Sequence, residues 1–537
     1  MKRIAIILAI AAAAFSLASC AEPAADAWAW TGEPEPFPEA LREMVAANRL
    51  VALPPPRADF AEASARLLTP NLCAEEDARV AAAVMQSFDR DLGRPESWLW
   101  SPTGAISRAE MEEDVRFVFD LLRYAYAGYQ YFGGDDVFLP MRDSMIELIH
   151  RLVDPAPVSL FLQHVLAPPL RGAISDNHFF IYNQPLQAHP QVAYMSDAHE
   201  LRMVEGDLVT EINGAPHRLV ETTRGGQPVD AVLPTLSADG ELVWNFGFVA
   251  SAAGAMQGIA AVFECVRTGE RTGLNVTLRI ADGIETVERR PLLDERMEGR
   301  VAVIENGRMR EDWEPGSCLC EYFEAFYMSG REARSNPVTI LDLRGNSGGF
   351  ASLPFQWMLG FTGNAPRCEL SFASFSLGTA TAAELLIANS PGSPDCPLDA
   401  YAPTVNMHVR EFIDDQSLRW LHPAEFRPLE TVRNENLVIV LMDWRVASAG
   451  EIFVAYLRSL ENVVFVGTNT SGTLVTGGVI SASLPNSGFA VSFGGILNLR
   501  PDLSQFEGSG FMPDLWVPSD ESLERVLRFV ERHGLAL

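Results

Sequence analysis

Four short apolar runs in the second half of the chain constrain the fold more than any other feature of the sequence. Each run is rich in β-branched residues, and stretches with helical periodicity separate them. Such runs are typical of strands buried on both faces of a parallel sheet, because the connecting helices cover both faces. The runs are VAVI at 301–304, VTILDL at 338–343, LVIVLMD at 437–443 and VVFVG at 463–467. The sequence therefore predicts an α/β core with a largely parallel sheet.

Two of these runs lead directly into turns of small residues. DLRGNSGG occupies 342–349, and VASAGE occupies 446–451. The carboxyl ends of parallel strands are where α/β folds place their chemistry. A serine at a strand-to-helix turn has the positive end of the helix beside it, and a neighbouring glycine turn can give a second N–H to a developing oxyanion. We therefore predict acyl transfer at Ser448, with the N–H groups of Gly349 and Ala449 as oxyanion donors.

The order of four motifs resembles that of the C-terminal processing and tricorn-type serine peptidases. DLRGNSGG is followed about a hundred residues later by ASAGE, then by VVFVGTNTSG, and finally by EGSGFMPDLWV at 507–517. The resemblance implies a ClpP/crotonase-like core and a serine peptidase with Ser448 as its nucleophile. It implies no metal and no organic cofactor. It also implies that Gly348 and Gly472 contact the substrate.

This family divides over the general base. In the tail-processing branch the base is a lysine that follows the nucleophile, but Thr473 occupies that place here and Lys2 is the only lysine in the chain. The tricorn-like branch uses an upstream histidine and a glutamate near the C-terminal motif. SDNH at 175–178 resembles that histidine segment, and Glu507 begins EGSGFMPD. The resemblance thus implies that His178 is the base, which a neutral imidazole suits near working pH, and that Glu507 orients it directly or through another side chain.

Two alternatives remain open. The residues at 345–349 also fit G-x-S-x-G, the nucleophile elbow of lipases and esterases, with Ser347 as the nucleophile. That interpretation leaves ASAGE without a role. In the preferred interpretation, residues 345–349 form an oxyanion turn, and Asp342 and Arg344 are a buried pair that supports this turn. The second alternative is a catalytically silent lipoprotein that binds peptides or other ligands on the same scaffold.

The periodicity changes twice upstream of the core. Apolar residues recur at three- and four-residue steps, which predicts helices near 39–49, 74–92, 108–128 and 139–153. From about 183 to 297, short β-type runs alternate with turns. Within them, EGDLVTEINGAP at 205–216 resembles the core of PDZ-type domains, which receive peptides by strand addition. The predicted substrates are therefore peptides or unfolded protein ends.

The first residues resemble a bacterial lipoprotein signal. Lys2 and Arg3 precede an apolar run that closes with LASC at 17–20. Cleavage before Cys20 would leave its thiol to carry a lipid, whereas an ordinary signal peptide would leave Cys20 unmodified. We predict an exported, lipid-anchored protein of the cell envelope, on the periplasmic or outer-membrane face.

Charge and cysteine content narrow the partners. The formal net charge of −29 argues against nucleic acid and anionic lipid as the main ligand. Cys318 and Cys320 lack the second ligand pair that a zinc site needs. Cys368 and Cys396 lie in a stretch punctuated by Pro and Gly, and we predict a disulfide between them.

These observations predict a multidomain α/β protein. The predicted segments are a signal peptide at 1–19, a tether at 20–38, a helical N-terminal domain at 39–170, a His-bearing segment at 171–185, a PDZ-like module at 186–297 and the peptidase core at 298–537.

Overall fold

The structure is a computed structural model of the chain. It describes residues 37–52, 104–182, 184–185, 191–252, 256–282, 290–309, 319–366, 372–375, 431–500 and 502–535, together with residues 58, 59, 62 and 67. The predicted helix at 74–92, Cys20, Cys73, Cys318, Cys368 and Cys396 lie outside these residues. Among the described residues, no helix combines the length and the apolar character needed to cross a bilayer.

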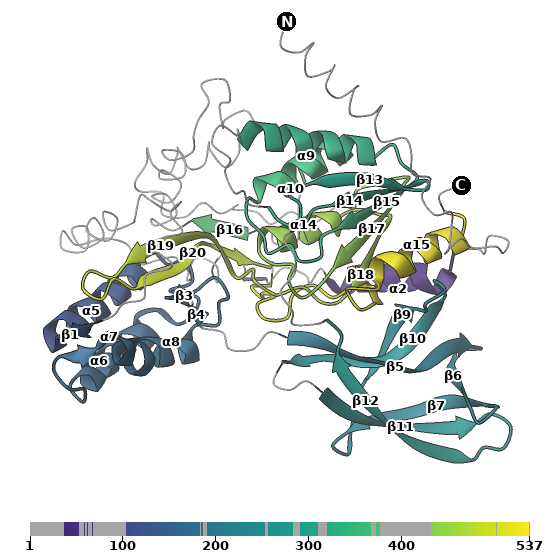
Figure 1. Ribbon diagram of the computed structural model, residues 1–537, viewed down its shortest axis with the longest axis horizontal. Coiled ribbons are helices and arrows are strands. Elements are labelled where there is room, and N and C mark those ends of the chain that lie inside the picture. Colours follow the sequence, from purple (N-terminus) through teal and green to yellow (C-terminus); the bar gives the residue numbers. More distant parts are fainter. Residues whose placement is uncertain are drawn as a thin grey trace, which may run out of the picture.

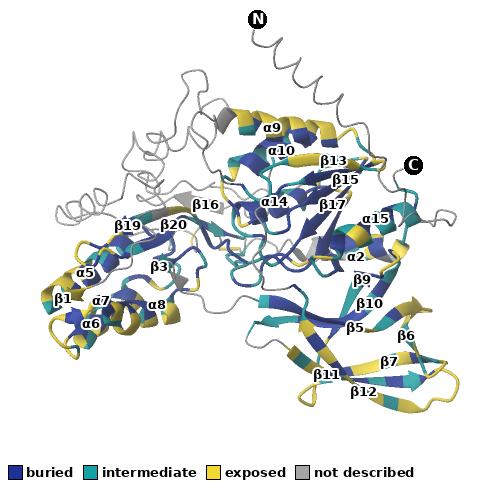
Figure 2. Cartoon of the chain, viewed as in Figure 1, coloured by how far each residue is buried: buried dark blue, intermediate teal, exposed yellow. Residues whose placement is uncertain are grey.

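The core is a six-stranded sheet in the order β13-β14-β15-β17-β18-β21 (Figure 1). β13 pairs antiparallel with β14, and every later pair is parallel. All residues of β15 and β18 are buried (Figure 2). The prediction of a largely parallel core sheet is confirmed, because the four apolar runs form β14, β15, β17 and β18. The strands span β13 Asp294–Glu298, β14 Val301–Glu305, β15 Val338–Asp342, β17 Leu437–Met442, β18 Val463–Gly467 and β21 Leu515–Trp516.

Helices cover both faces of this sheet (Figure 1). One face packs against α9, α10 and α14, with Phe326, Trp357 and Phe453 in its apolar cluster. The other face packs against α2 and α15 through Leu41 and Phe529. The helix bounds are α2 Glu39–Ala52, α9 Leu319–Ala333, α10 Ser352–Thr362, α14 Ala449–Leu457 and α15 Ser522–Arg532. The helix predicted near 39–49 is present, but it packs on the core sheet, so its assignment to a helical N-terminal domain is wrong.

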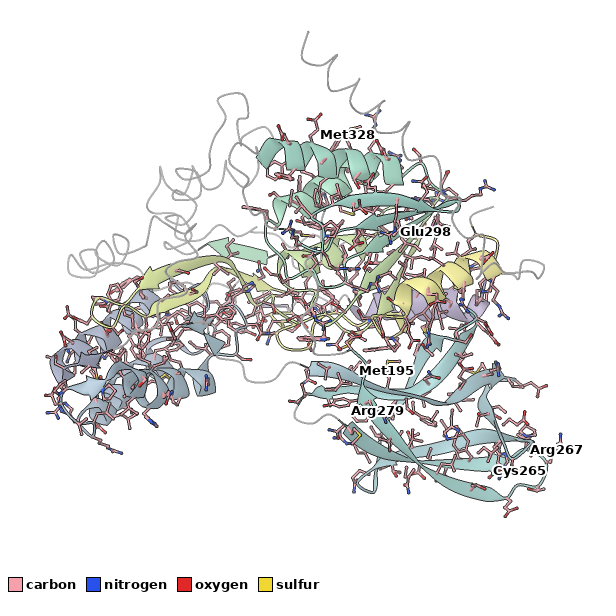
Figure 3. All side chains as sticks on the ribbon, in the orientation of Figure 1. Met195, Cys265, Arg267, Arg279, Glu298 and Met328 are labelled. Carbon is pink, nitrogen blue, oxygen red and sulfur yellow. The ribbon has the colours of Figure 1, made fainter. Side chains whose placement is uncertain are left out.

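The segment from 191 to 282 forms a β-barrel module. β5, β6, β7, β11 and β12 close on themselves because β12 pairs with both β11 and β5, and β10 and β9 extend the sheet from β5. Met195 and Arg279 face each other across the closing pair, and Cys265, a free and buried cysteine, lies at the other end of the module (Figure 3). The strand bounds are β5 Gln191–Val204, β6 Asp207–Ile212, β7 Ala215–Arg224, β8 Gln227–Pro228, β9 Val232–Leu236, β10 Leu242–Ser251, β11 Met256–Cys265 and β12 Arg271–Ile280.

The prediction of a PDZ-like module is correct in its β-rich character and wrong in its architecture. The matching sequence forms only the β6–β7 hairpin, with Asn213 and Gly214 at positive φ in its turn, and such a hairpin fits many antiparallel folds. No helix occurs in the described part of 191–282. Closure also pairs strand edges that addition of a peptide strand would need.

A third sheet and a group of helices lie beside the core (Figure 1). β20 pairs with β16, β19 and β3. The helices share an apolar cluster with Val491 and Phe493 of β20. Their bounds are α5 Arg108–Tyr124, α6 Gly134–Ile149, α7 Val158–Phe161, a π-helix at Leu162–Leu166 and α8 Ala167–Ala173; the strands are β1 Ala105–Ile106, β2 Ala156–Pro157, β3 Phe180–Ile181, β4 Gln184–Pro185, β16 Phe372–Phe375, β19 Thr476–Ser483 and β20 Ala490–Leu499.

Candidate active site

Ser448 lies in a strained turn between β17 and α14. Its φ of 52° and ψ of −118° are a conformation that a residue with a side chain rarely adopts. Ser448 is the N-cap of α14, so the positive end of that helix lies beside its hydroxyl. The side chain is half-buried. This is the geometry of a nucleophile elbow: a sharp strand-to-helix turn that presents the hydroxyl at the end of a buried strand.

The glycine turn after β15 packs directly against Ser448. A Cβ atom on Gly348 would lie 2.8 Å from Ser448 Cβ and 3.0 Å from the Ala449 nitrogen. Only glycine allows this approach, and Gly348 and Gly349 have φ values of 91° and 138°. Among the described residues, no hydrogen bond uses the N–H of Gly349 or of Ala449. The structure thus places the glycine turn that contains Gly349 against Ser448 and Ala449, and the role of the two N–H groups as oxyanion donors stays a prediction.

His178 follows α8 and precedes β3, and it is buried. Its backbone N–H donates to Asp176 Oδ1 at 2.8 Å. Burial lowers the pKa of the imidazole below its ordinary 6.5, although the charge of Asp176 and a hydrogen bond to the Thr476 backbone act in the opposite direction. Its Nδ1 has no hydrogen-bond partner among the described residues. Within the same residues, no hydrogen bond joins His178 to Ser448 Oγ.

Glu507 lies in the loop between β20 and β21, next to the His178 segment. Its carboxylate accepts from the backbone N–H of Asn177 at 2.5 Å and from those of Leu474 and Val475 at 2.9 and 2.8 Å. Burial, and then the charge of Asp176, raise the pKa of Glu507 well above 4.5. No hydrogen bond joins its carboxylate to the imidazole among the described residues. Glu507 therefore contacts the backbone beside His178 and not the ring.

Glu451, in the first turn of α14, is fully buried. Its carboxylate accepts from the backbone N–H groups of Ser448 at 3.2 Å, Gly472 at 2.7 Å and Thr473 at 2.8 Å, and from Thr470 Oγ1 at 2.6 Å. Burial raises its pKa to about 7, although these hydrogen bonds lower it. Glu451 thus ties the nucleophile turn to the loop that begins at Thr470.

Residues 323–517 match the model of peptidase family S41. The chain therefore carries a peptidase family S41 domain. It is a serine-type peptidase, a hydrolase that acts on peptides or proteins, and its S41 domain has a mixed α/β fold beside the β-barrel module.

Several solved structures of low sequence identity are similar to this chain. Mature CPAF is 17% identical, with 80% of this chain and 95% of that chain covered and a TM-score of 0.40. The photosystem II D1 C-terminal processing protease is 11% identical, with 80% and 99% covered and a TM-score of 0.32. The tricorn protease is 12% identical, with 79% and 37% covered and a TM-score of 0.32. These scores are too low to carry an argument. No curated protein gives a match.

The charged residues of the turn after β15 form a buried ion pair. Arg344 donates to Asp342 through Nε at 2.8 Å and through Nη2 at 2.6 Å. Arg290 contributes two further hydrogen bonds to Asp342, at 3.1 and 3.0 Å, and one to the Arg344 carbonyl at 2.6 Å. Burial alone would raise the pKa of Asp342, but the two guanidinium groups outweigh it and hold the pKa below 3.8. The predicted buried pair is confirmed, and Arg290 is an additional member.

The alternative nucleophile, Ser347, lacks the geometry of an elbow. Its side chain is exposed, and it is not among the residues with positive φ. The next helix, α10, begins only at Ser352. Ser347 therefore has neither the strained turn nor the helix N-terminus that G-x-S-x-G enzymes use.

The two other glycines predicted at the site are held by internal contacts. The Gly348 N–H donates to Asn346 Oδ1 at 2.9 Å. The Gly472 carbonyl accepts from the Gly508 N–H at 2.8 Å and from Asn177 Nδ2 at 2.9 Å. Their predicted contact with substrate stays a prediction.

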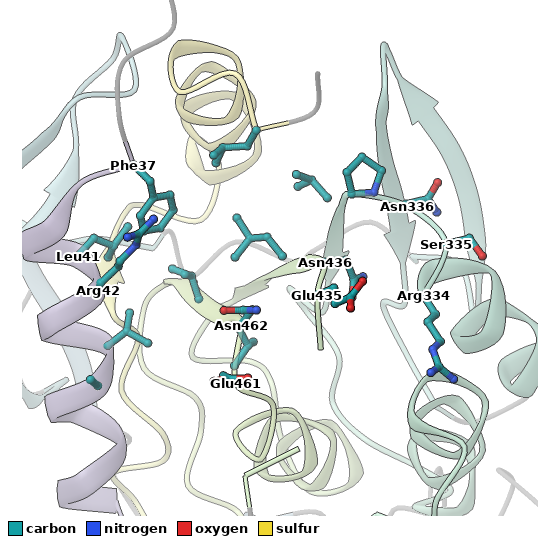
Figure 4. Close-up of a pocket in the computed structure, with 18 residues that line it drawn as sticks. Phe37, Leu41, Arg42, Arg334, Ser335, Asn336, Glu435, Asn436, Glu461 and Asn462 are labelled. Atoms are coloured by element: carbon teal, nitrogen blue, oxygen red, sulfur yellow. The ribbon is translucent and has the colours of Figure 1, made fainter. Parts of the chain in front are cut away.

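A cavity of about 840 Å³ lies at the opposite edge of the core sheet (Figure 4). Its lining includes Val338, Leu437 and Val463, which begin β15, β17 and β18. Ser448 and Gly349 follow the other ends of these strands. The cavity is therefore separate from the candidate active site.

Four residues of the site were not identified from the sequence. Asp176 and Glu451 belong to the motifs SDNH and ASAGE, in which the sequence assigned a function only to His178 and Ser448. Tyr126 donates to Asp176 Oδ2 at 2.8 Å, and Thr476 Oγ1 donates to the same oxygen at 2.7 Å. Because 50 and 300 residues separate these two from Asp176, no local pattern signals their contact.

Proposed function

We propose that this protein is an exported, lipid-anchored serine peptidase that cleaves peptides or unfolded protein ends through an acyl-enzyme at Ser448. The observation that carries the proposal is the strained turn at Ser448 with the glycine turn packed against it. Among the described residues, the N–H groups of Gly349 and Ala449 have no hydrogen-bond partner. A hydroxyl at a helix N-terminus next to two free N–H groups suits formation of a tetrahedral oxyanion.

In the proposed reaction, Ser448 Oγ attacks the scissile carbonyl carbon while its proton passes to His178. The imidazolium then gives this proton to the leaving amine, and the carbonyl re-forms as the acyl-enzyme. Water, deprotonated by His178, releases the second product and restores Ser448. The lowered pKa of His178 supports this role, because the ring is neutral at working pH and can accept a proton. A hydrogen bond between base and nucleophile often tightens only when substrate is bound.

We further propose that the enzyme belongs to the histidine-using, tricorn-like branch of this class. Thr473 occupies the place where the tail-processing branch has its lysine. Its Oγ1 contacts Ser471 Oγ at 2.8 Å. Glu507 assists by holding the backbone beside His178 rather than by bonding the ring.

The test is labelling with a fluorophosphonate, followed by mass mapping of the adduct, on the wild type and on Ser448→Ala and Ser347→Ala. Peptides and short-chain esters are assayed in parallel. We expect an adduct on Ser448 alone, together with peptide cleavage. An adduct on Ser347 with ester turnover would instead assign the activity to Ser347, in the turn after β15. No adduct on any serine would indicate a binding protein.

The anchor has a separate test. We expect wild-type protein to fractionate with membranes and its N-terminal peptide to carry the mass of a lipid on Cys20. The Cys20→Ala variant should appear in the soluble fraction. Equal membrane association of both would contradict the lipoprotein assignment.

A further inference from the structure

The loop at 470–476, called here the bridge loop, lies between the two halves of the candidate active site. Its sequence, TSGTLVT, contains no titratable side chain. Three carboxylates nevertheless hold it: those of Glu451 and Asp176, which are fully buried, and that of Glu507, which is partly buried. Each of them also accepts a hydrogen bond from a backbone N–H at or next to a proposed catalytic residue.

Glu451 holds the first part of the bridge loop. It accepts from Thr470 Oγ1 and from the N–H groups of Gly472 and Thr473. The same carboxylate accepts from the Ser448 N–H. Thr470 Oγ1 in turn accepts from the Phe511 N–H at 2.7 Å. The position of the nucleophile turn is therefore coupled to the position of the loop.

Glu507 and Asp176 hold the second part. Glu507 joins the N–H groups of Leu474 and Val475 to that of Asn177. Asp176 joins Thr476 Oγ1 to the N–H of His178 and to the Tyr126 hydroxyl.

We propose that the bridge loop sets the distance and orientation between Ser448 and His178, with Glu451 and Asp176 as positioning residues at its two ends. This inference rests on the proposed function. Each carboxylate accepts hydrogen bonds from two or more donors, and removal of one carboxylate leaves several buried donors without a partner. A displacement of about 1 Å between nucleophile and base is enough to cost about 10²-fold in rate.

This proposal explains how the site functions with threonine where the tail-processing branch has its lysine. In that branch the same loop carries the base. Here the loop supplies only backbone and hydroxyl groups, and the base arrives on a different segment, more than 250 residues before Ser448. Because that segment is far from the nucleophile along the chain, the contacts across the bridge loop have to hold the two together.

The test compares Glu451→Gln and Asp176→Asn with wild type in time courses of fluorophosphonate labelling at several probe concentrations. The amplitude gives the fraction of competent sites. The limiting rate constant and the half-saturating concentration separate reactivity from probe binding. We expect the limiting rate constant per competent site to fall by about 10²-fold, with half-saturation within about threefold of wild type. Glu461→Gln, which removes an exposed carboxylate paired with Arg433, is the control and should behave as wild type.

A merely structural role predicts the opposite pattern, in which the amplitude falls and the rate constant per competent site is unchanged, and that result would overturn the proposal. If either variant fails to fold, Thr470→Val and Thr476→Val carry the test, since each removes one hydroxyl donor to Glu451 or Asp176. Wild-type rates in both would also overturn it. If wild type itself is not labelled at Ser448, the proposed function has failed instead, and the two failures are distinguishable.

Discussion

The turns after β15 and β17 occupy equivalent places at the same edge of the core sheet, yet they have different physical properties. Each follows a buried strand, contains a serine and is rich in small residues. The β17 turn bends sharply at Ser448 and enters α14 at once. The β15 turn leaves Ser347 exposed and extends for several residues before α10.

The buried carboxylates next to the two turns also differ, in their charged neighbours and in their pKa values. Asp342 faces two guanidinium groups, and its pKa is lowered. Glu451 faces only neutral donors, and its pKa is raised to about 7 by burial. Sequence motif and place in the sheet therefore do not distinguish the two serines, whereas backbone strain, the adjacent helix terminus and the local charges do.

The largest expected effect separates the two serines. Ser448→Ala should reduce kcat for peptide hydrolysis by about 10⁶-fold, as loss of a nucleophile does in other serine peptidases. Ser347→Ala should change kcat by no more than about twofold, because surface substitutions have small effects. The measurement is steady-state hydrolysis of one peptide by both purified variants. Similar losses in both would remove the distinction between the turns.

The next effect concerns the ion pair under the β15 turn. Asp342→Asn should lower the free energy of unfolding by about 3–5 kcal/mol, because it leaves Arg344 buried without its paired carboxylate and leaves Arg290 with only Glu305. Glu298→Gln, on edge strand β13 of the same sheet, is the control and should cost no more than about 1 kcal/mol, since its pair with Arg296 is solvent-accessible. Urea denaturation measures both. Equal stabilities would mean that the buried pair does not support the turn.

Contact between the two turns is tested at Gly348. Gly348→Ala should lower kcat by about 10²- to 10³-fold, the cost of losing an oxyanion donor, because the new methyl group displaces the turn from Ser448. Gly258→Ala, in β11, meets nothing within 4 Å and should leave kcat unchanged. Wild-type kcat in Gly348→Ala would place the oxyanion elsewhere.

The smallest effect is the dependence of the free energy of unfolding on pH. Glu451 and Asp342, the carboxylates next to the two turns, should contribute to it with opposite signs. Glu451 has a folded pKa of about 7 against an ordinary 4.5, so its contribution is present below pH 4.5 and is lost as the pH rises through about 7. The loss is on the order of 3 kcal/mol. Asp342 has a lowered pKa, so its contribution is present above its ordinary value and is lost in acid.

The measurement is the difference in unfolding free energy between wild type and Glu451→Gln from pH 4 to pH 8. We expect the wild type to lose unfolding free energy relative to Glu451→Gln as the pH rises. A difference that stays constant across this range would show that Glu451 does not titrate there.

Much of the core was predictable because its signals are local. A run such as VTILDL is buried on both faces whatever surrounds it, so β15 and its neighbours could be recognised from composition alone. The Ser448 turn also had a local signal, in small residues after an apolar run. The barrel module was less predictable, because EGDLVTEINGAP specifies a hairpin and says nothing about which strands close around it.

The sequence by itself determined the strands of the core and marked the candidate nucleophile, because each depends on residues close together in the chain. Only the tertiary structure decided that Ser448 and not Ser347 has the strained turn, that α2 packs on the core and that the barrel closes. It alone also showed that Glu451, Glu507 and Asp176 hold one loop. These features depend on hydrogen bonds and packing between segments up to 330 residues apart, and no local pattern in a sequence records which distant donor a buried carboxylate will meet.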